Sequence, residues 1–337
     1  MSNLLVWVLR GLLALCLQLR YPAVRFQKEE SVRKDPAYAV YETYRYAYER
    51  YGYLFSYAEK TEEKENTASD GTEAVQAGAE NMLSAASLAR LQDYDYLMKQ
   101  YFSVHASTTA ERSLMKAERL LETDVGLTKN PDEPQILIYH THASETYADY
   151  GPQNTDADVV GAGTYLTELL RQRGWNVIHD TTAYDRKEGK LERSRAYTYA
   201  LEGVQGILQT HPTIEVVLDL HRDGVADSVR LTENINGKPT AQIMFFQGMS
   251  RTPEGEIAYL PNPHLQENLA FCFQMQLACG RYPGFARKIY LKGLRYNLHL
   301  RGRSSLIEAG AQTNTIEEAR NAMELLAEAI DTVLQGT

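Results

Sequence analysis

Cysteine is scarce in this sequence, and its few copies are not spaced for metal or redox chemistry. Only 3 cysteines occur in 337 residues, which is too few for a disulfide framework, and no two of them form a C-x-x-C pair. Cys272 and Cys279 lie in an apolar helical pattern, which predicts buried thiols. Positive charge is also in short supply, because the formal net charge is -9. A protein that binds nucleic acid needs a basic surface, so we expect no nucleic-acid partner.

Long hydrophobic runs are missing as well. The most apolar stretch covers residues 4–19 and is interrupted by Arg10. A helix that spans a bilayer needs about 20 apolar residues, so this stretch is short for a span. We therefore assign residues 1–20 to a hydrophobic export or anchor segment, with a helix on the membrane surface as the alternative.

The chain up to residue 130 falls into two further parts. Residues 21–80 comprise a tyrosine-rich stretch, which suits a partner-binding surface or the core of a small domain, and then a polar linker. Residues 81–130 return to helical periodicity, and the Thr-Thr-Ala-Glu pattern from Thr108 to Glu111 predicts a capped helix. We expect a small helical and extended subdomain there. The proline-flanked turn that follows marks the start of the main domain, residues 131–337.

Strand and helix patterns alternate through this main domain. Alternation of this kind predicts a three-layer α/β domain whose mostly parallel sheet is flanked by helices. The predicted strands are 136–139, 175–178, 214–220, 241–246, 288–291 and 304–308. The helices between them centre on 160–170, 196–207 and 268–278, and a last helix with a Thr315/Glu318 capping box closes the chain.

Residues suited to metal binding and proton transfer gather where three of these strands end. His140, His142 and Glu145 follow the first strand, His221 follows the third, and Glu308 closes the last. Because functional crevices of open α/β sheets lie at the carboxyl ends of strands, we expect these side chains to meet. A solvated turn that happens to hold two histidines is the alternative for the first group.

These residue types suit a catalytic zinc ion, which needs about three protein ligands and one open position for water. His142, Glu145 and His221 supply that count, and Glu308 is then left as general base. Zinc lowers the pKa of bound water towards about 7, which makes a nucleophile available for attack on an amide carbonyl.

Several neighbours of these residues have two interpretations. Asp219 or Asp223 could orient the imidazole of His221 as a hydrogen-bond acceptor. Arg222 either receives a carboxylate of the substrate or pairs with a nearby aspartate.

Two residues near the last strand are similarly ambiguous. Arg303, at its start, either binds a substrate carboxylate or makes an ion pair. Asn314, beyond its end, contacts substrate or marks the entry to the last helix.

The motifs from Leu91 onward resemble the stage II sporulation protein P family, peptidoglycan hydrolases of endospore-forming bacteria. Many separate motifs occur in the family's order, which makes a chance match negligible. The stretches that carry the resemblance are D-Y-D-Y-L from Asp93, I-Y-H-T-H from Ile138 with Glu145, D-L-H-R-D-G from Asp219, I-M-F-F from Ile243, N-L-A-F from Asn268, R-Y-N from Arg295 and I-E-A-G-A-Q-T-N from Ile307.

The resemblance implies a zinc-dependent N-acetylmuramoyl-L-alanine amidase, with cleavage of peptide cross-links also attributed to the family. The fold is expected to be similar to that of the wider amidase-3 group of zinc enzymes. That group's pattern places the first zinc histidine at His142 and the catalytic glutamate at Glu308, leaving His140 as a supporting residue or an alternative ligand. The group takes its ligand glutamate from the following helix, so Glu145 departs from the pattern.

The resemblance also implies a membrane-anchored, extracytoplasmic protein at the mother-cell membrane that faces the forespore septum. Its partners are then peptidoglycan, a lytic transglycosylase and a multi-spanning membrane protein, which act together in wall remodelling during engulfment. The N-terminal segment departs from the expected anchor in being short and in containing Arg10.

Two other functions fit the same residues. One is a non-catalytic wall-binding scaffold, in which the N-terminal parts do the binding. The other is a zinc carboxypeptidase-like hydrolase of wall peptides, with Arg222 or Arg303 holding the terminal carboxylate.

Overall fold

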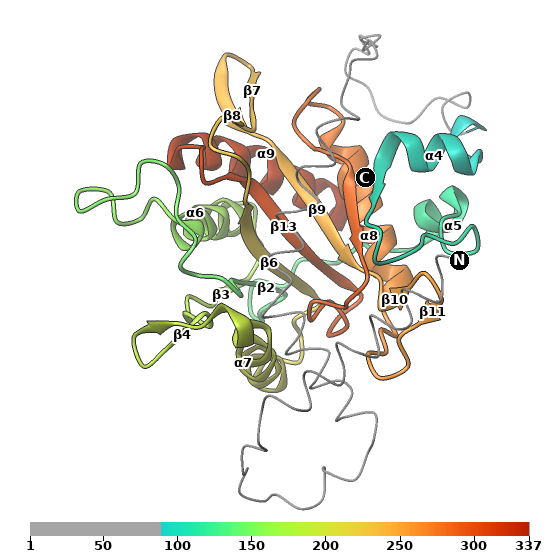
Figure 1. The fold of residues 1–337 in the computed structure, drawn as a ribbon, viewed down its shortest axis with the longest axis horizontal. Helices are drawn as coiled ribbons and strands as arrows, with labels where there is room; N and C mark the ends of the chain where they lie inside the picture. The colour runs from blue at the N-terminus through green and yellow to red at the C-terminus, as the bar shows by residue number, and fades with distance from the viewer. Residues whose placement is uncertain (1–88, 337) are drawn as a thin grey trace, which may run out of the picture. The chain divides into compact units, whose positions relative to one another are not determined.

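The structure, a computed structural model, describes residues 89–336 and centres on one sheet with helices on both faces (Figure 1). The sheet has seven strands in the order β1-β12-β9-β13-β6-β2-β3. These strands are β1 (Phe102–Val104), β2 (Ile136–Tyr139), β3 (Val177–His179), β6 (Val216–Asp223), β9 (Ile243–Gly248), β12 (Ile289–Lys292) and β13 (Arg303–Ala311). The predicted α/β class with a mostly parallel sheet is confirmed.

Strand direction decides which strand ends meet. All neighbouring strands of the sheet are parallel except β13 and β9, which are antiparallel. β13, β6, β2 and β3 therefore place their carboxyl ends at one edge, while β9, β12 and β1 run the other way. Every residue of β2 is buried, as expected for an apolar strand covered on both faces.

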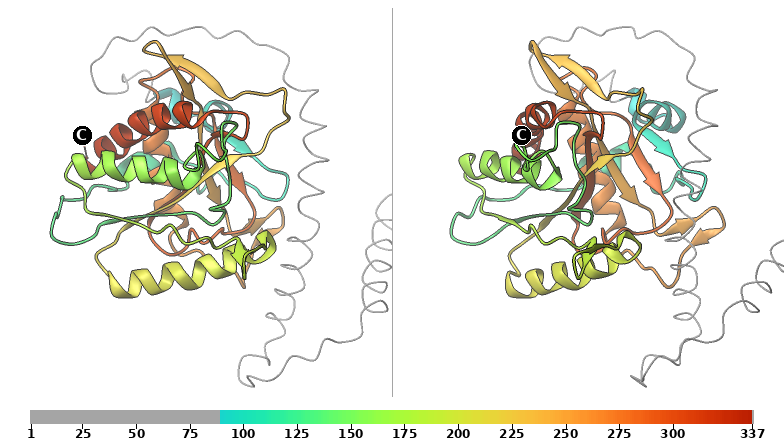
Figure 2. Two further views of the ribbon diagram at one scale, coloured as in Figure 1. Left: turned by 90° about the vertical axis from the view of Figure 1, so that its left-hand side faces the viewer. Right: turned by 60° about the vertical axis from the view of Figure 1, so that its left-hand side comes forward.

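Helices cover the two faces unequally. Figure 2 shows α6 and α9 side by side on one face and α7 on the opposite face. Residues of β2 alternate accordingly, because Ile138 belongs to the large core under α6, α8 and α9, whereas Leu137 packs with Val204 of α7. The helices are α4 (Tyr94–Tyr101), α5 (Ala117–Glu122), α6 (Val159–Gln172), α7 (Ala196–Thr210), α8 (Leu265–Cys279) and α9 (Ile316–Gln335).

The last helix begins as its sequence predicts. The Thr315 hydroxyl accepts a hydrogen bond from the backbone N–H of Glu318, and the Glu318 carboxylate accepts one from the backbone N–H of Thr315. This reciprocal pair satisfies two N–H groups that a helix start leaves without partners. Gly336 closes the helix in the left-handed conformation.

The predicted subdomain over 81–130 does not have a core of its own among its described residues, 89–130. β1 is the outermost strand on one side of the central sheet and pairs with β12. Leu97 and Leu120 belong to the same large core as the rest of the described protein. The predicted capped helix from Thr108 is wrong. Glu111 instead pairs with the Arg251 guanidinium, and α5 begins only at residue 117 without a side-chain cap.

Three short hairpins were not expected from the sequence. They are β4 (Arg186–Lys187) with β5 (Lys190–Leu191), β7 (Thr232–Ile235) with β8 (Lys238–Ala241), and β10 (Arg251–Thr252) with β11 (Gly255–Glu256). Each hairpin lies between a strand of the central sheet and the next large element of the chain, so the strict alternation of strand and helix that was predicted does not hold.

The predictions for residues 1–80 lie outside the described residues. Among residues 89–336, no helix combines the length and the apolar character needed to cross a bilayer. The two cysteines of α8 are buried free thiols, as predicted.

Candidate metal centre

The turn after β2 carries the first two members of the site. The backbone N–H of Glu145 donates to the carbonyl of His142 at 3.1 Å, so the chain folds back tightly within one turn. The carbonyl of Glu145 then accepts from the N–H of Val159, the first residue of α6, at 3.0 Å. A rigid strand on one side and a helix start on the other thus hold both side chains in place.

Three potential ligands converge at this edge of the sheet. One donor atom each of His142, Glu145 and His221 lies within 4.8 Å of the others. The Glu145 carboxylate sits between the two imidazoles, with Oε1 3.4 Å from His142 Nδ1 and Oε2 3.6 Å from His221 Nδ1. Glu145 and His221 are buried. Imidazole nitrogens and a carboxylate form a donor set that zinc binds once the imidazoles are neutral, so these residues fit the ion.

Asp219 fixes the orientation of the His221 ring. Its Oδ1 lies 2.8 Å from His221 Nε2, which leaves Nδ1 to face Glu145. Asp219 is fully buried and also accepts hydrogen bonds from the backbone N–H and the hydroxyl of Thr141, at 2.8 and 2.6 Å. Of the two aspartates considered for this role, Asp219 is the one whose carboxylate contacts the His221 ring.

The charges in the cluster shift one another's protonation. Burial alone would lower the pKa of His221, but the charge of Asp219 and the contact with Glu145 raise it well above its usual value. Burial alone would raise the pKa of Glu145, but hydrogen bonds with His142 and His221 bring it well below its usual value. The carboxylate is thus ionised and available as a ligand.

Glu308 lies beside this cluster on the neighbouring strand. It pairs with His221 in the register of β13 and β6, and its Oε2 is buried without a hydrogen-bond partner. Burial, and next the charge of Asp223, raise the pKa of Glu308 to about 8. Asp223 in turn accepts a hydrogen bond from Arg287 at 2.8 Å. A buried carboxyl group with a raised pKa is suited to carrying a proton.

His140 points away from this cluster and contacts another histidine. Its Nδ1 lies 2.8 Å from the carbonyl oxygen of Leu220, and its Nε2 lies 2.8 Å from Nε2 of His179. Because the carbonyl can only accept, His140 Nδ1 carries the proton, and His179 Nε2 must donate to the bare Nε2 of His140. The pair links the ends of β2, β3 and β6.

No sequence pattern indicated the partner of His140. His179 has no ligand spacing to another histidine, although it ends the strand next to β2. Gly163 of α6 packs directly on the pair, since an added Cβ would lie 2.7 Å from His140 Nε2. Burial lowers the pKa of each histidine to about 4, and for His140 the charge of its partner contributes as well.

Arg222 donates hydrogen bonds from its guanidinium to backbone carbonyls beside the site. Its guanidinium donates to the carbonyls of Thr146 and Asp223, at 3.0 and 3.2 Å, and its backbone N–H lies 3.2 Å from Glu145 Oε2. It therefore braces the two segments that carry the ligands. This contact is neither of the two roles considered for it from the sequence.

Arg303 lies at the end of the sheet opposite the clustered residues, and of its two interpretations the structure shows the ion pair, made with Glu215. As the first residue of β13 it donates to the carbonyls of Val125 and Gly126 and pairs with Glu215. Asn314 is fully buried, and its side chain binds the backbone of Ala311 and the carboxylate of Glu318. It is a helix-entry residue.

Two residues beside the site were missed by sequence reasoning. The ring of Tyr197 in α7 lies 5.7 Å from the ring of His142. The hydroxyl of the buried Tyr147 donates to the carbonyl of Ala309 at 3.0 Å and thereby ties the ligand turn to β13. Tyrosines are frequent in this sequence, with 23 in all, so their identity alone gave no signal.

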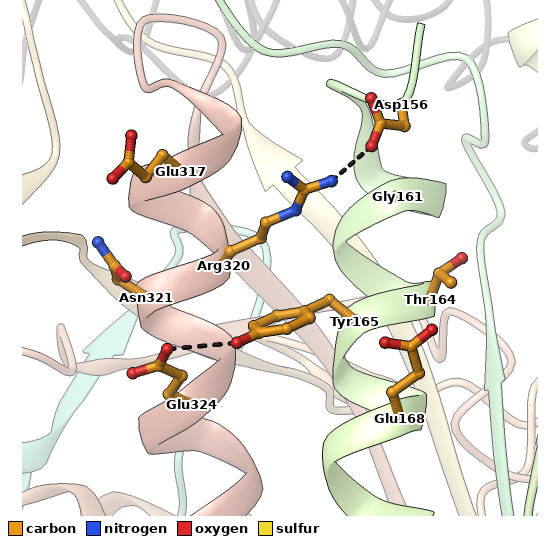
Figure 3. A pocket seen from close by; sticks show the side chains of 9 residues that line it. All are labelled: Asp156, Gly161, Thr164, Tyr165, Glu168, Glu317, Arg320, Asn321 and Glu324. Atoms are coloured by element: carbon orange, nitrogen blue, oxygen red, sulfur yellow. Dashed lines mark hydrogen bonds and ion pairs between the residues drawn. The ribbon is translucent and has the colours of Figure 1, made fainter. Parts of the chain in front are cut away.

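A surface pocket of about 490 Å³ lies elsewhere, between α6 and α9 (Figure 3). In it, Arg320 pairs with Asp156, and the Tyr165 hydroxyl donates to Glu324 at 3.2 Å. None of the three clustered ligands lines this pocket. It is a charged groove between two packed helices and is separate from the metal centre.

The fold and the site together define an α/β protein with a candidate metal centre at the carboxyl edge of its sheet. The chain belongs to the stage II sporulation protein P (SpoIIP) family, whose family model matches residues 29–331. The resemblance drawn from the motifs is thus confirmed.

Stage II sporulation protein P of Bacillus subtilis (strain 168) is a curated relative, 25% identical over 213 residues. The match covers 58% of this chain and 50% of that protein, so the chain spans about half the length of the relative. Among solved structures, the CwlD amidase of Clostridioides difficile, in complex with the GerS lipoprotein, is 18% identical with a TM-score of 0.38, covering 60% of this chain and 97% of that one. The N-acetylmuramoyl-L-alanine amidase AmiC2 of Nostoc punctiforme is 13% identical with a TM-score of 0.35, covering 61% and 97%.

Proposed function

We propose that this protein is a peptidoglycan hydrolase, a zinc-dependent N-acetylmuramoyl-L-alanine amidase that remodels septal wall during engulfment in endospore formation. The observation that carries the proposal is the convergence of His142, Glu145 and His221 beside the half-buried Glu308, whose Oε2 is buried without a hydrogen-bond partner. Membership of the stage II sporulation protein P family supports the setting.

In this proposal His142, Glu145 and His221 hold the zinc ion. When bound, zinc supplies a polarised amide carbonyl and an acidified water. Asp219 would leave Nδ1 of His221 as the nitrogen that holds the ion, because the carboxylate lies on the Nε2 side of the ring and Nδ1 faces Glu145. Buried carboxylate partners of this kind also make the imidazole a stronger ligand.

Glu308 moves the proton in this proposal. Its Oε2 takes a proton from the attacking water and delivers it to the amide nitrogen of the departing peptide. A raised pKa suits both steps, because the group must hold the proton and then release it near neutral pH. The scissile bond joins the lactyl group of the glycan to the L-alanine of the stem peptide, and cross-link cleavage would use the same groups.

The two arginines named for the carboxypeptidase alternative both make other contacts. Arg303 lies at the wrong edge of the sheet, and Arg222 already donates to two backbone carbonyls. The family resemblance further supports a membrane-attached, extracytoplasmic protein held by residues 1–20, with the lytic transglycosylase and the multi-spanning membrane protein as partners.

Mass spectrometry of muropeptides released from purified sacculi tests the proposal. The intact protein should release stem peptides with a free L-alanine amino terminus and should contain about one zinc per chain by metal analysis. His142→Ala combined with His221→Ala should lose both metal and release. His211→Ala, at the far end of α7, is the matched control and should lose neither. A scaffold would show no stoichiometric zinc and would bind sacculi equally well after the double change.

A further inference from the structure

A short, strongly basic segment follows β3. Residues 186–195 read R-K-E-G-K-L-E-R-S-R and hold five arginines and lysines against two glutamates, in a chain whose net charge is -9. They form the β4–β5 hairpin and the 3-10 helix Arg193–Arg195, which we call together the basic hairpin. It projects beside α7 in Figure 1. All five basic side chains are exposed.

The base of the basic hairpin is attached to the turn that carries two of the candidate ligands. Asp185 is fully buried, and its carboxylate accepts hydrogen bonds from the backbone N–H of Ser144, at 3.1 Å, and from the Ser144 hydroxyl. Ser144 lies between His142 and Glu145 in that turn. The backbone N–H of Glu192 donates to the Asp185 carbonyl at 2.7 Å and closes the base.

The other end of the basic hairpin also reaches the metal centre. It leads directly into α7, whose residue Tyr197 lies against the ring of His142. The ring of Tyr199 holds two of the positive charges, Lys187 Nζ at 5.3 Å and Arg195 Cζ at 5.0 Å from its centre. The positive surface is therefore continuous with the surroundings of the ligand His142.

Three of the positive charges have no counterion among residues 89–336. Arg186, Lys190 and Arg193 form no salt bridge with any residue in the described part of the chain. A like-charged cluster of this kind repels itself and attracts anions over about 10 Å at moderate salt. An anionic ligand would lower this repulsion.

We propose that the basic hairpin binds the carboxylates of the wall's stem peptides while the amide at the root of a peptide lies at the metal centre. This inference rests on the proposed function, because it takes the anionic polymer to be the substrate. Stem peptides carry side-chain and terminal carboxylates, and a protein of net charge -9 would otherwise repel them. The hairpin thus selects the peptide side of the polymer and orients it towards Glu308.

Co-sedimentation of the full-length protein with purified sacculi tests this binding. Glu308→Gln is present throughout so that the wall stays intact. The hairpin variant combines R186Q, K190Q and R193Q, and the matched control combines K99Q, K116Q and R119Q, three exposed basic residues on α4 and beside or on α5. We expect the hairpin variant to bind roughly tenfold more weakly at low salt, and the control to bind like the parent.

Chemistry on the wall identifies the anion. Sacculi whose carboxylates have been converted to amides should bind the parent and the hairpin variant equally weakly. Equal binding of hairpin and control variants to native sacculi would overturn the inference, and so would an unchanged difference on amidated sacculi. It would also be overturned if the hairpin changes weakened binding only to vesicles of phosphatidylglycerol and phosphatidylcholine.

The same preparations separate this inference from the proposed function. Muropeptide release is measured with Glu308 intact. Release with equal sacculus binding by both variants would keep the hydrolase and reject the hairpin's role. Absence of release, together with weaker binding by the hairpin variant, would reject the hydrolase and keep the hairpin as a binding site for wall carboxylates.

Discussion

Changing Asp219 to Asn tests how the His221 ligand is oriented. The Asp219 carboxylate lies 2.8 Å from His221 Nε2 and accepts from the Thr141 N–H and hydroxyl at 2.8 and 2.6 Å. Asparagine keeps the shape but removes the charge, and its NH₂ group must face one of these donors. If the NH₂ group takes the place of Oδ1, the His221 Nε2 and the Thr141 N–H lose their carboxylate oxygen. If it takes the place of Oδ2, the Thr141 hydroxyl loses its acceptor.

The expected magnitude follows from the role of such partners. Loss of a buried carboxylate behind a ligand histidine typically weakens zinc binding by about 10- to 100-fold, or about 1.4–2.8 kcal/mol. Loss of charge-assisted bonds from Thr141 should also lower the free energy of unfolding by about 2 kcal/mol. Competition with a chelator of known affinity measures the zinc Kd, and urea denaturation of the metal-free protein measures stability.

Asp180→Asn is the matched control. Its carboxylate also accepts from a threonine N–H and hydroxyl, those of Thr182 at 3.1 and 2.6 Å, but none of the clustered ligands contacts it. It should leave the zinc Kd unchanged. If Asp219→Asn folds and binds zinc with the affinity of the parent, Asp219 does not orient the ligand, and the reasoning fails.

Other perturbations have equally specific outcomes. Gly163→Ala should lower the free energy of unfolding, measured in urea, by about 1–3 kcal/mol, because the new Cβ would lie 2.7 Å from His140. The control Gly206→Ala in α7 places a Cβ with no atom within 4 Å and should be neutral or stabilising. The folded pKa of both His140 and His179 is about 4, below the usual 6.5, so the unfolded chain binds more protons than the folded protein between these two pH values. The metal-free protein should therefore lose stability as pH falls from about 6.5 towards 4. Urea midpoints that stay constant over this pH range would contradict the prediction. Glu308→Gln should abolish muropeptide release while zinc binding is retained. Because the folded pKa of Glu308 is raised to about 8, this change should also stabilise the metal-free protein more at pH 8 than at pH 5.

Most strand positions and the three clustered side chains were predictable because each depends on a local signal, whereas β1 lies in a stretch whose periodicity predicted helix. An apolar run such as Ile136–Tyr139 marks a buried strand, and the carboxyl ends of parallel strands meet at one edge. The location of Arg303 could also have been predicted. A residue that opens a strand parallel to β2 must lie at the edge opposite His142.

Other features depend on tertiary contacts that leave no local trace. Hydrophobic periodicity carries no strand direction, so the antiparallel β9 was not foreseen. Glu111 suited a capping box, but a distant arginine, Arg251, competes for its carboxylate. The pairing of His140 with His179 requires β2 and β3 to be neighbours, which the order of elements along the chain allows but does not specify.

The register between β13 and β6 has a consequence for how this protein can change over evolution. Glu308 and His221 are neighbours on adjacent strands, so the spacing of the backbone ladder, about 4.8 Å, sets the separation of their Cα atoms. Insertions in the surrounding loops can reshape what enters the crevice without moving these two residues apart. Only slippage of a whole strand could do that, and it would turn every apolar side chain of that strand to the wrong face. Substrate preference is therefore free to drift while the spacing of these two groups stays locked.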